Sequence, residues 1–494
     1  MFLALAEPMS TAVLLLVFGT LVLFSVLFSR PLTRIGVPVV LLFLVLGMIG
    51  GSEGFGGVSF EDYGLAFRLG TVALVLILFD GGLNTASASI RQSLLPAGLL
   101  ATVGVAGTAG VMALGAKMFG LSWGESLLIG AVVSSTDAAA VFAVLRGGNV
   151  NVKEPVRSTL EVESCINDPM AVILTVTIVE ILRDGGSVEW RDLAMLPVQL
   201  LVGATVGCAI GFAGRHVLER VRFGTAGLYP VATLSLAFLA FGLATLLMGS
   251  GFLAVFTAGC VLGNGQLPYK AGLTRVHDAI AWFAQVSMFL MLGLLSFPSR
   301  LVDVAGVGLA LGLVLAIVAR PVVVMLCLLP LRWKKNPVVY VSWVGIRGAV
   351  PIILATIPIM AGLQNSERVF DVVFFVVVVS VLVPGASILP ITRWLGLEAR
   401  GRPNPSTLLE MNTLRRTDGE IFVYRVDQST AVCGARLADI PFPEHASVLL
   451  VVRGDELLPA RGATILLEAD FAYVFCRSED EPAIGLLFGS SVAR

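Results

Sequence analysis

The sequence has little charge. Only 14% of its 494 residues are Asp, Glu, Lys or Arg, whereas soluble globular proteins carry about 25%. Hydrophobic residues make up 56% of the chain. The 33 Lys and Arg residues nearly balance the 34 Asp and Glu residues, so there is no basic excess that would favour nucleic acid as a partner. The composition excludes a set of soluble domains and predicts a polytopic membrane protein, with membrane lipids around it.

Cysteine and histidine are also scarce. The six cysteines follow no disulfide or metal-ligand spacing, and the three histidines form no cluster in the sequence, so we expect no cofactor and no resident metal. The chain also lacks the glycine-rich phosphate loop that ends in Gly-Lys-Ser/Thr, the Thr-Val-Gly-Tyr-Gly filter, and a Gly-x-Gly-Asp run. These absences disfavour an ATP-driven pump, a potassium channel and an intramembrane protease. We predict that the protein is not an enzyme.

What the sequence does contain is a series of long apolar runs. A helix that spans a bilayer needs roughly 20 apolar residues. By this measure we predict about 13 spans, at 9–29, 36–50, 66–84, 94–116, 125–145, 157–182, 193–214, 226–248, 250–264, 279–297, 303–329, 337–362 and 369–392. The second and ninth runs are short, so each could instead be a re-entrant or interrupted segment. The first run lacks a basic segment before it, which favours a retained span over a cleaved signal peptide.

Basic residues are concentrated in alternate connections between these runs. The connections that follow odd-numbered runs carry 15 Lys and Arg residues, and the others carry 6. Because basic connections stay on the cytoplasmic side, this alternation predicts a multi-pass protein of the cytoplasmic (inner) membrane with its N-terminus outside and its C-terminus in the cytoplasm.

The composition changes near residue 398. Charged residues recur every few positions in 398–494, and short apolar runs at 421–426, 448–453 and 471–477 predict strands bounded by Gly, Pro and Asp. We predict two domains, a transmembrane domain over 1–397 and a small α+β cytosolic domain over 398–494. About 90 residues make a marginal core, so a second copy of the chain is expected to help stabilise this domain.

A polar segment interrupts the sixth apolar run. It reads Glu163-Ser164-Cys-Ile-Asn167-Asp168-Pro169. On a helix, Ser164 lies beside both Asn167 and Asp168, because residues three and four apart are neighbours. Charges within a bilayer are costly and by default indicate function, and these oxygen ligands suit a proton or a monovalent cation. The alternative is a structural polar pair that joins helices.

The fifth and twelfth runs are each interrupted near the middle. Ser134-Ser-Thr136-Asp137 offers side-chain hydrogen bonds that compete with the helix, and Arg347 lies between glycines and Pro351. If spans 1–6 and 8–13 form two units, each broken helix is the fifth of its unit, and the odd seventh span inverts the second unit. Matching broken helices in two inverted repeats indicate the site of a transporter. A helix cap at a misplaced span end is the alternative for Asp137.

Two further charges lie inside predicted spans. Arg320 precedes Pro321 in the eleventh span, and a buried guanidinium needs a carboxylate, for which Glu163 is the preferred partner. This pair is predicted to be structural support for the site, as is Arg347. Asp80, near the end of the third span, could be a carboxylate of an entry funnel or an ordinary interfacial residue.

Taken together, these motifs resemble those of the monovalent cation:proton antiporters of the NhaP branch, which are related to the animal sodium/proton exchangers. The matching residues are Thr136-Asp137, the Glu163 to Pro169 segment, Arg320 and the Gly345 to Pro351 segment. The resemblance implies that Asp168 carries the ion or the proton and that Thr136, Asp137 and Ser164 complete the site. It implies that Asn167 makes the exchange electroneutral, and that Glu163 pairs with an arginine. It also implies a homodimer with a rigid dimerisation domain and a moving core.

The C-terminal domain resembles the regulatory module of potassium transport proteins known as TrkA-C or RCK-C. The likeness runs from Gly434-x-x-Leu437 to Thr464 and Asp470, with Ala469 where the module usually has Gly. It implies regulation by a small molecule or nucleotide and favours K⁺ over Na⁺ as the cation. The expected function is K⁺ or Na⁺ exchange for H⁺ in cation and pH homeostasis. The alternatives are a ligand-gated cation channel controlled by the tail and a sensor with an inactive site.

Overall fold

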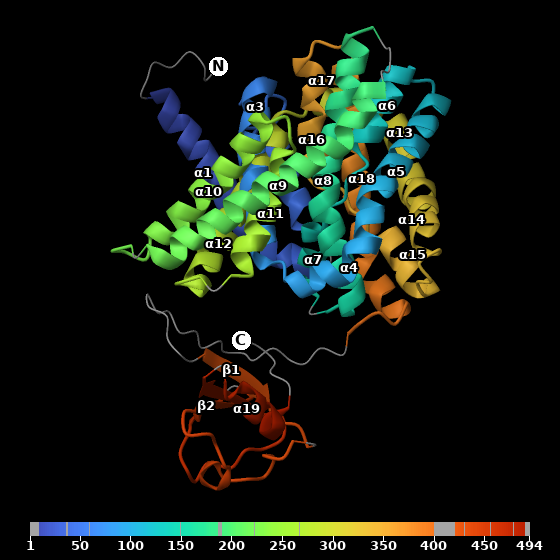
Figure 1. The fold of residues 1–494 in the computed structure, drawn as a ribbon. Helices are drawn as coiled ribbons and strands as arrows, with labels where there is room; N and C mark the ends of the chain where they lie inside the picture. The colour runs from blue at the N-terminus through green and yellow to red at the C-terminus, as the bar shows by residue number, and fades with distance from the viewer. Residues whose placement is uncertain are drawn as a thin grey trace. The chain divides into compact units, whose positions relative to one another are not determined.

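The computed structural model describes residues 9–35, 38–58, 60–148, 150–185, 190–221, 223–265, 267–399, 420–428, 430–454, 456–477 and 479–489. These residues form two compact units (Figure 1). The first unit is a helical bundle that holds the described residues up to 399, apart from 223–229 and 267–275. The second unit holds those two segments and the described residues of the C-terminal region.

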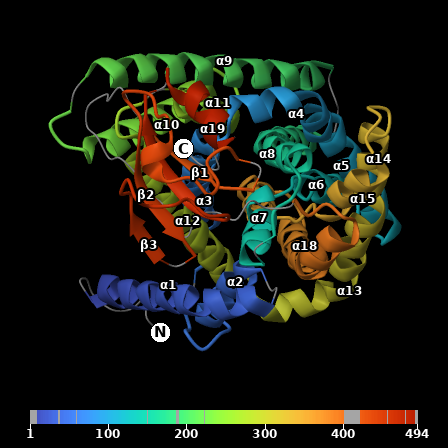
Figure 2. The same cartoon turned by 90° about the horizontal axis from the view of Figure 1, so that it is seen from below.

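The bundle follows the predicted apolar runs. Its first half contains α1 (Met9–Ile35), α2 (Val39–Gly50), α3 (Tyr63–Asn84), α4 (Ser87–Leu99), α5 (Val105–Met118), α6 (Trp123–Val132), α7 (Ala138–Gly147) and α8 (Glu154–Arg183). The long helix α9 (Trp190–Arg220) follows and lies on the outside of the bundle in Figures 1 and 2. The second half contains α10 (Leu228–Leu246), α11 (Gly251–Gly263), α12 (Lys270–Leu294), α13 (Pro298–Val314), α14 (Arg320–Leu328), α15 (Lys335–Trp343), α16 (Val350–Leu354), α17 (Thr356–Met360) and α18 (Ser366–Trp394).

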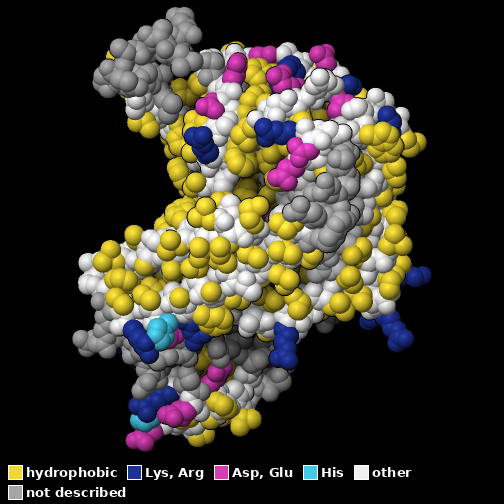
Figure 3. All heavy atoms as spheres, turned by 45° about the horizontal axis from the view of Figure 1, so that its top comes forward, with side chains coloured by type: hydrophobic (Ala, Val, Ile, Leu, Met, Phe, Trp, Pro, Cys, Tyr) yellow, Lys and Arg dark blue, Asp and Glu magenta, His cyan; other side chains and the backbone are white. Residues whose placement is uncertain are grey.

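Each of the predicted apolar runs falls on one or more of these helices, except that residues 36 and 37 lie outside the described residues. Among the described residues, eight helices are long and apolar enough to cross a membrane, and shorter apolar helices lie between them. In Figure 3, hydrophobic side chains cover most of the visible flank and charged side chains gather near the upper face. The helical polytopic class predicted from the sequence is therefore confirmed.

Two membrane helices contain a short π-helical segment. Residues Leu100–Gly104 (η2) connect α4 to α5, and residues Leu315–Ala319 (η3) connect α13 to α14. The two composite helices are the fourth and the eleventh predicted spans, which correspond to each other in the predicted repeats. Their contacts are reciprocal, since α5 packs against η3 and α14 packs against η2. This arrangement agrees with two inverted repeats.

The helices of the bundle form two groups (Figure 2). In the first helix group, α1 to α3 pack with α9 to α12. Helix α11 packs against α3 and α9, and His277 of α12 contacts Phe79 of α3. Helices α2 and α12 are also close, since a Cβ on Gly47 of α2 would lie 2.3 Å from the Leu290 carbonyl oxygen of α12. In the second helix group, α4 to α8 pack with α13 to α18, chiefly through α6 and α7 against α18 and through α5 against α13.

The C-terminal region contains a four-stranded antiparallel sheet in the order β1-β4-β2-β3. Its elements are β1 (Glu420–Arg425), β2 (Ser447–Arg453), β3 (Glu456–Pro459), β4 (Phe471–Cys476) and helix α19 (Glu481–Phe488). Side chains of β1, β4 and α19 share one apolar core. The three predicted strands correspond to β1, β2 and β4. The edge strand β3 was not predicted, because four residues give too short an alternation to detect.

Candidate functional site

The two broken helices cross and are joined through their backbones. Residues 133–137 separate α6 from α7, and residues 344–349 separate α15 from α16. At the crossing, the backbone N–H of Asp137 donates to the carbonyl oxygen of Ile346 at 2.8 Å. The Asp137 carboxylate then caps α7, because its Oδ1 accepts from the Ala140 N–H at 3.1 Å. The predicted interruptions of both spans are thus present in the structure and meet each other.

Glycine makes this close crossing possible. A Cβ on Gly348 would lie 2.2 Å from Oδ2 of Asp137, which is far inside van der Waals contact. Because glycine has no side chain, the backbone of the second break can lie directly against the Asp137 carboxylate.

Helix α8 is bonded to the first break. The Ser164 hydroxyl donates to the Thr136 carbonyl oxygen at 2.9 Å and accepts from the Ala138 N–H at 3.1 Å. One turn along the helix, the Asn167 amide donates from Nδ2 to the Thr136 hydroxyl at 2.6 Å, and both of these side chains are buried. These bonds satisfy backbone groups that the broken helix leaves without helical partners. They also hold the next residue, Asp168, beside the break.

Asp168 is partly exposed, and the buried side chain of Ser135 lies beside its carboxylate. Asp137 is also partly exposed, and it is the acid whose negative charge acts most strongly on the Asp168 carboxylate. The structure therefore brings together Asp168, Asp137, Thr136, Ser164 and Asn167 from the predicted site, and it adds Ser135. The sequence singled out the run of hydroxyl residues around Ser135 only as a helix-breaking signal.

Arg347 lies within the second break and is 1% exposed. Its Nε donates to the Val133 carbonyl oxygen at 2.9 Å, and its Nη1 donates to the carbonyl oxygen of Gly345. Val133 directly follows α6, so its carbonyl belongs to the partly negative end of that helix. The guanidinium offsets this negative end at the crossing. Its Nε and Nη1 thus both donate to backbone oxygens.

Arg320, at the start of α14, forms a buried ion pair with Glu163 of α8. Nη1 of Arg320 and Oε1 of Glu163 are 2.6 Å apart, and the two side chains are 3% and 1% exposed. The pair connects the eleventh span to the helix that carries Asp168. The pair lies close to Arg347, because the charges of Arg320 and Glu163 both interact electrostatically with the Arg347 guanidinium.

Asp80 lies apart from these hydrogen bonds. Its carboxylate accepts from Nδ2 of Asn84 at 3.0 Å, and the nearby acid that acts on it is Asp278 of α12. Among the described residues, no hydrogen bond joins Asp80 to Asp168. The adjacent residue of α3 does approach α8, since a Cβ on Gly81 would lie 4.0 Å from the Cys165 sulfur. Asp80 is partly exposed, at a position near the predicted end of its span.

The chemistry of the crossing is that of hard oxygen ligands. Two carboxylates, hydroxyl groups and backbone carbonyls lie around the breaks, and such groups bind protons and monovalent cations rather than soft metals. Within the described residues, no group of three or more His, Cys, Asp or Glu side chains could hold a resident metal ion.

Comparisons with known proteins agree with this geometry. Residues 15–394 match the family model described as sodium/hydrogen exchanger, transmembrane. The chain is 38% identical to the K(+)/H(+) antiporter NhaP of Alkalimonas amylolytica, over 97% of this chain and 84% of that protein. It is 40% identical to the K(+)/H(+) antiporter NhaP2 of Shewanella oneidensis, over 94% and 82% respectively.

More distant proteins share part of the chain or only the fold. The Na(+)/H(+) antiporter ApNhaP of Aphanothece halophytica is 27% identical over 73% of this chain and 70% of that protein. The solved structure of the sodium proton antiporter MjNhaP1 of Methanocaldococcus jannaschii has a TM-score of 0.64 at 22% identity, and the match covers 74% of this chain and 97% of that one. The comparisons do not support the channel alternative. The chain belongs to the sodium/hydrogen exchanger family and is a multi-pass membrane cation/proton antiporter.

Proposed function

We propose that this protein exchanges K⁺ for H⁺ at Asp168, one for one, by alternating access. The observation that carries the proposal is the position of Asp168. It is a partly exposed carboxylate on α8, held beside the crossing of two broken helices by the bonds of Ser164 and Asn167 to Thr136. Asp137, Thr136 and Ser164 complete the proposed site, and Asn167, Glu163, Arg320 and Arg347 support it.

The coupling follows from sharing one carboxylate between two ligands. A proton and a cation cannot both neutralise Asp168, so the binding of one displaces the other. The neutralised site can change its access from one side of the membrane to the other, whereas a bare carboxylate is costly to move through a low-dielectric barrier. The uncharged amide of Asn167 adds no second titrating group, which supports an electroneutral exchange. Asp80 and Asp278 would attract cations toward the site from the Asp80 side.

The choice of K⁺ over Na⁺ rests on the relatives. Those named K(+)/H(+) antiporters are 38% and 40% identical and align over more than nine-tenths of the chain. The relative named a Na(+)/H(+) antiporter is 27% identical over 73% of the chain. The oxygen ligands at the crossing do not themselves distinguish the two ions, because both bind hard oxygen groups.

The central test replaces Asp168 with Asn in the full-length protein, reconstituted in vesicles that carry an internal pH-sensitive dye. We expect Asp168→Asn to abolish cation-dependent proton movement while the protein remains folded. Glu161→Gln is the matched control, because Glu161 lies on the same helix and pairs at the surface with Arg157 at 3.0 Å. Robust pH-dependent exchange by Asp168→Asn would contradict the assignment.

The same vesicles test the ion and the type of transport. We expect fluorescence recovery to be greatest with K⁺ when K⁺, Na⁺ and Li⁺ are compared across pH. An imposed pH gradient should drive the cation uphill, whereas a channel would only dissipate the cation gradient. Preference for Na⁺ would overturn the proposed substrate, and absence of any flux would favour the sensor with an inactive site.

We propose that residues 1–397 perform transport as a homodimer in the cytoplasmic membrane, with the N-terminus outside, and that residues 398–494 regulate it from the cytoplasm. The RCK-C resemblance of the tail and its separate apolar core support this division. Comparing exchange by the full chain with exchange by a chain that ends at residue 397 tests the regulatory part. Equal rates and equal pH profiles for the two would argue against it.

A further inference from the structure

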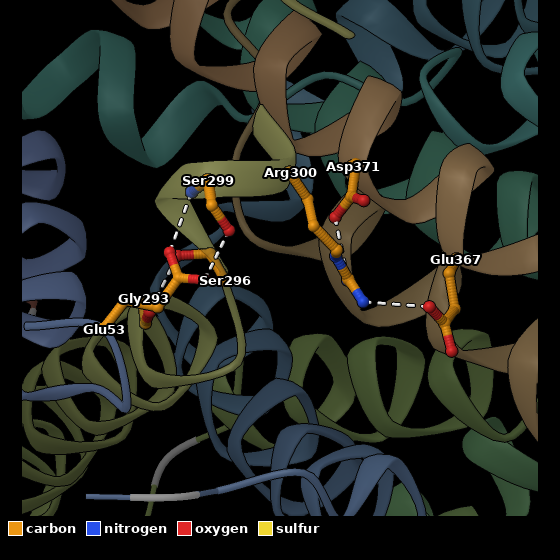
Figure 4. A network of polar contacts seen from close by, with 7 residues as sticks. All are labelled: Glu53, Gly293, Ser296, Ser299, Arg300, Glu367 and Asp371. Carbon is orange, nitrogen blue, oxygen red and sulfur yellow. Dashed lines mark hydrogen bonds and ion pairs between the residues drawn. The ribbon is translucent and has the colours of Figure 1, made fainter. Parts of the chain in front are cut away.

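A polar network joins the two helix groups at the end of the bundle that is distant from Asp80. The loop after α2 brings Glu53 to the start of α13, where the Ser299 N–H donates to Oε2 at 2.8 Å and the Ser299 hydroxyl donates to Oε1 (Figure 4). A carboxylate at a helix N-terminus accepts from N–H groups that have no partner within the helix. Glu53 therefore fastens the first helix group to the first turn of α13, which belongs to the second group.

This bond lies at a joint between the groups. Helix α12 ends at Leu294 and the chain enters α13 at Pro298, so only three residues connect the two groups here. The loop with Glu53 is itself anchored to α12, since a Cβ on Gly51 would lie 3.4 Å from the Leu294 carbonyl oxygen. The bond from Glu53 to Ser299 thus spans the short connection between α12 and α13.

Arg300, the next residue, organises the second half of the network. Its Nη1 donates to Oε2 of Glu367 at 2.9 Å and its Nη2 donates to Oδ1 of Asp371 at 3.0 Å, as Figure 4 shows. Asp371 is 3% exposed, whereas the Glu367 side chain is 62% exposed, so Asp371 is the partner less screened by water. Both acids lie on α18 in the same helix group as Arg300. They hold the guanidinium in place.

Tyr63 is the partner of Arg300 from the other helix group. Its side chain lies beside the Arg300 guanidinium, and its ring packs edge-on against Phe370 of α18 with centroids 5.8 Å apart. Tyr63 begins α3, the helix that carries Asp80 seventeen residues later. At about 1.5 Å per residue, the two lie at opposite ends of α3, roughly 25 Å apart.

The two ends of α3 differ in packing. At the Tyr63 end, Ala66 is 1% exposed, and a Cβ on Gly70 would lie 2.7 Å from the side chain of Ile353. At the Asp80 end, Asp80 itself, Cys165 and Asp168 are all partly exposed. On the Tyr63 side, α3 is therefore packed directly against the second helix group through Gly70 and Ile353, whereas partly exposed acids lie toward the Asp80 side.

We propose that Glu53 and Tyr63 of the first helix group form a latch with Ser299 and Arg300 of the second helix group, and that this latch holds the Tyr63 side of the antiporter closed. The latch bonds break when the second helix group moves to expose the site on that side. This inference rests on the proposed alternating-access function. It assigns to Glu367 and Asp371 the role of positioning residues, which keep Arg300 aimed at Tyr63.

The test measures closure directly. Ala66→Cys places a thiol on α3 one turn from Tyr63, on a face that is buried in the closed arrangement. The full-length protein is reconstituted in vesicles and treated with a membrane-impermeant maleimide, and labelling at position 66 is read by peptide mass spectrometry so that the six native cysteines do not interfere. We expect Glu53→Gln combined with Tyr63→Phe to raise the labelling rate about tenfold, which corresponds to ~1.4 kcal/mol of lost closed-state stabilisation.

Two controls make the result specific. Glu61→Gln removes an exposed carboxylate from the same loop and should leave the rate unchanged. Each single latch variant should give an intermediate rate, so the proposal can still be judged if the double variant does not fold. The proposal would be overturned if the folded latch variants were labelled at position 66 no faster than the Glu61→Gln control.

A second readout uses transport. Because opening raises the population that accepts a cation from the Tyr63 side, the KM for cation on that side should fall and the KM on the other side should rise. The labelling assay does not require transport and can be repeated with Asp168→Asn. If the latch variants label like the control, the latch is wrong but the assignment of Asp168 as the ion-binding residue is unaffected. If Asp168→Asn still exchanges ions, the Asp168 assignment is wrong but the labelling result for the latch remains valid.

Discussion

The backbone N–H of Asp137 donates to the carbonyl oxygen of Ile346, 209 positions further along the chain (346 − 137). This one bond connects the break in the fifth predicted span to the break in the twelfth. Neither break is thus an isolated defect, because each supplies backbone groups that the other leaves unpaired. The site is a product of both halves of the bundle.

Gly348→Ala tests the crossing. Its Cβ would lie 2.2 Å from Oδ2 of Asp137, so the carboxylate has to move or the breaks have to separate. We expect exchange activity to fall about a hundredfold, since displacing a functional group by about 1 Å can have an effect of that size. Gly98→Ala in α4 is the matched control, because a Cβ there meets nothing within 4 Å. Normal exchange by Gly348→Ala would mean that the Asp137 position is not critical.

Much of this arrangement could be predicted from the sequence, for physical reasons. Lipid requires that backbone groups be satisfied within each segment, so apolar runs become helices and their limits can be read from composition. The breaks at 134–137 and 345–351 could be predicted because hydroxyl, acidic and glycine residues weaken a helix locally. The pairing of Glu163 with Arg320 was expected because a buried charge needs an opposite one.

Other parts had no signal in the sequence. Arg347 is bonded to the backbone carbonyls of Val133 and Gly345, and a backbone acceptor is the same at every residue. The contact of Ser135 with Asp168 depends on how α8 is rotated against the break, which residue spacing within one segment does not determine. The π segment η3 (Leu-Ala-Ile-Val-Ala) is wholly aliphatic and η2 (Leu-Ala-Thr-Val-Gly) adds Thr and Gly, and neither composition distinguishes a π turn from an α turn.

The ion pair of Glu163 and Arg320 is expected to matter for stability more than for ion binding. Removing one member leaves the other charged and buried, which costs about 3–5 kcal/mol. Glu163→Leu and Arg320→Met should each lower the melting temperature of the purified protein strongly. The double variant Glu163→Leu with Arg320→Met should lose less than the sum of the two. Strict additivity in thermal unfolding would show that the two residues do not act as a pair.

Asn167→Asp is expected to change the charge balance of transport. The amide donates to the Thr136 hydroxyl at 2.6 Å and carries no charge, whereas Asp would place a second carboxylate beside Asp168. Exchange by Asn167→Asp should become sensitive to an imposed membrane potential in vesicles. The exposed Asn336→Asp serves as control and should remain insensitive. Unchanged voltage insensitivity in Asn167→Asp would remove the role given to Asn167.

The latch should be insensitive to pH near neutrality. The side-chain and backbone hydrogen bonds from Ser299 lower the pKa of Glu53 from its usual 4.5. A group whose pKa is lowered on folding stabilises the contact above its usual pKa and loses this effect as pH falls through the lowered value. Divided at each pH by the labelling rate of the unfolded protein, which cancels the pH dependence of thiol ionisation, labelling at Ala66→Cys should be constant between about pH 6 and 8 and should rise only in acid. With Glu53→Gln already present, the acid-induced rise should be smaller.

Ala469 in the C-terminal domain has φ +70°, a left-handed conformation that costs an L-residue about 1–2 kcal/mol. This is the position where the resembling regulatory module usually has Gly. Ala469→Gly should stabilise the sheet by about 1 kcal/mol, and hydrogen exchange of β4 in the full-length chain should slow accordingly. Ala483→Gly, within α19, should act in the opposite direction because glycine weakens a helix interior.

The π segment Leu315–Ala319 immediately precedes Arg320. A π turn accommodates one more residue than an α turn, and each added residue rotates everything that follows by about 100° around the helix axis. Removing one residue from this segment would turn the guanidinium toward a different neighbour and leave Glu163 facing apolar side chains. A homologue that is one residue shorter here would have to neutralise the acid from another helix or replace it, so insertions and deletions at this point should co-vary with the residue at position 163.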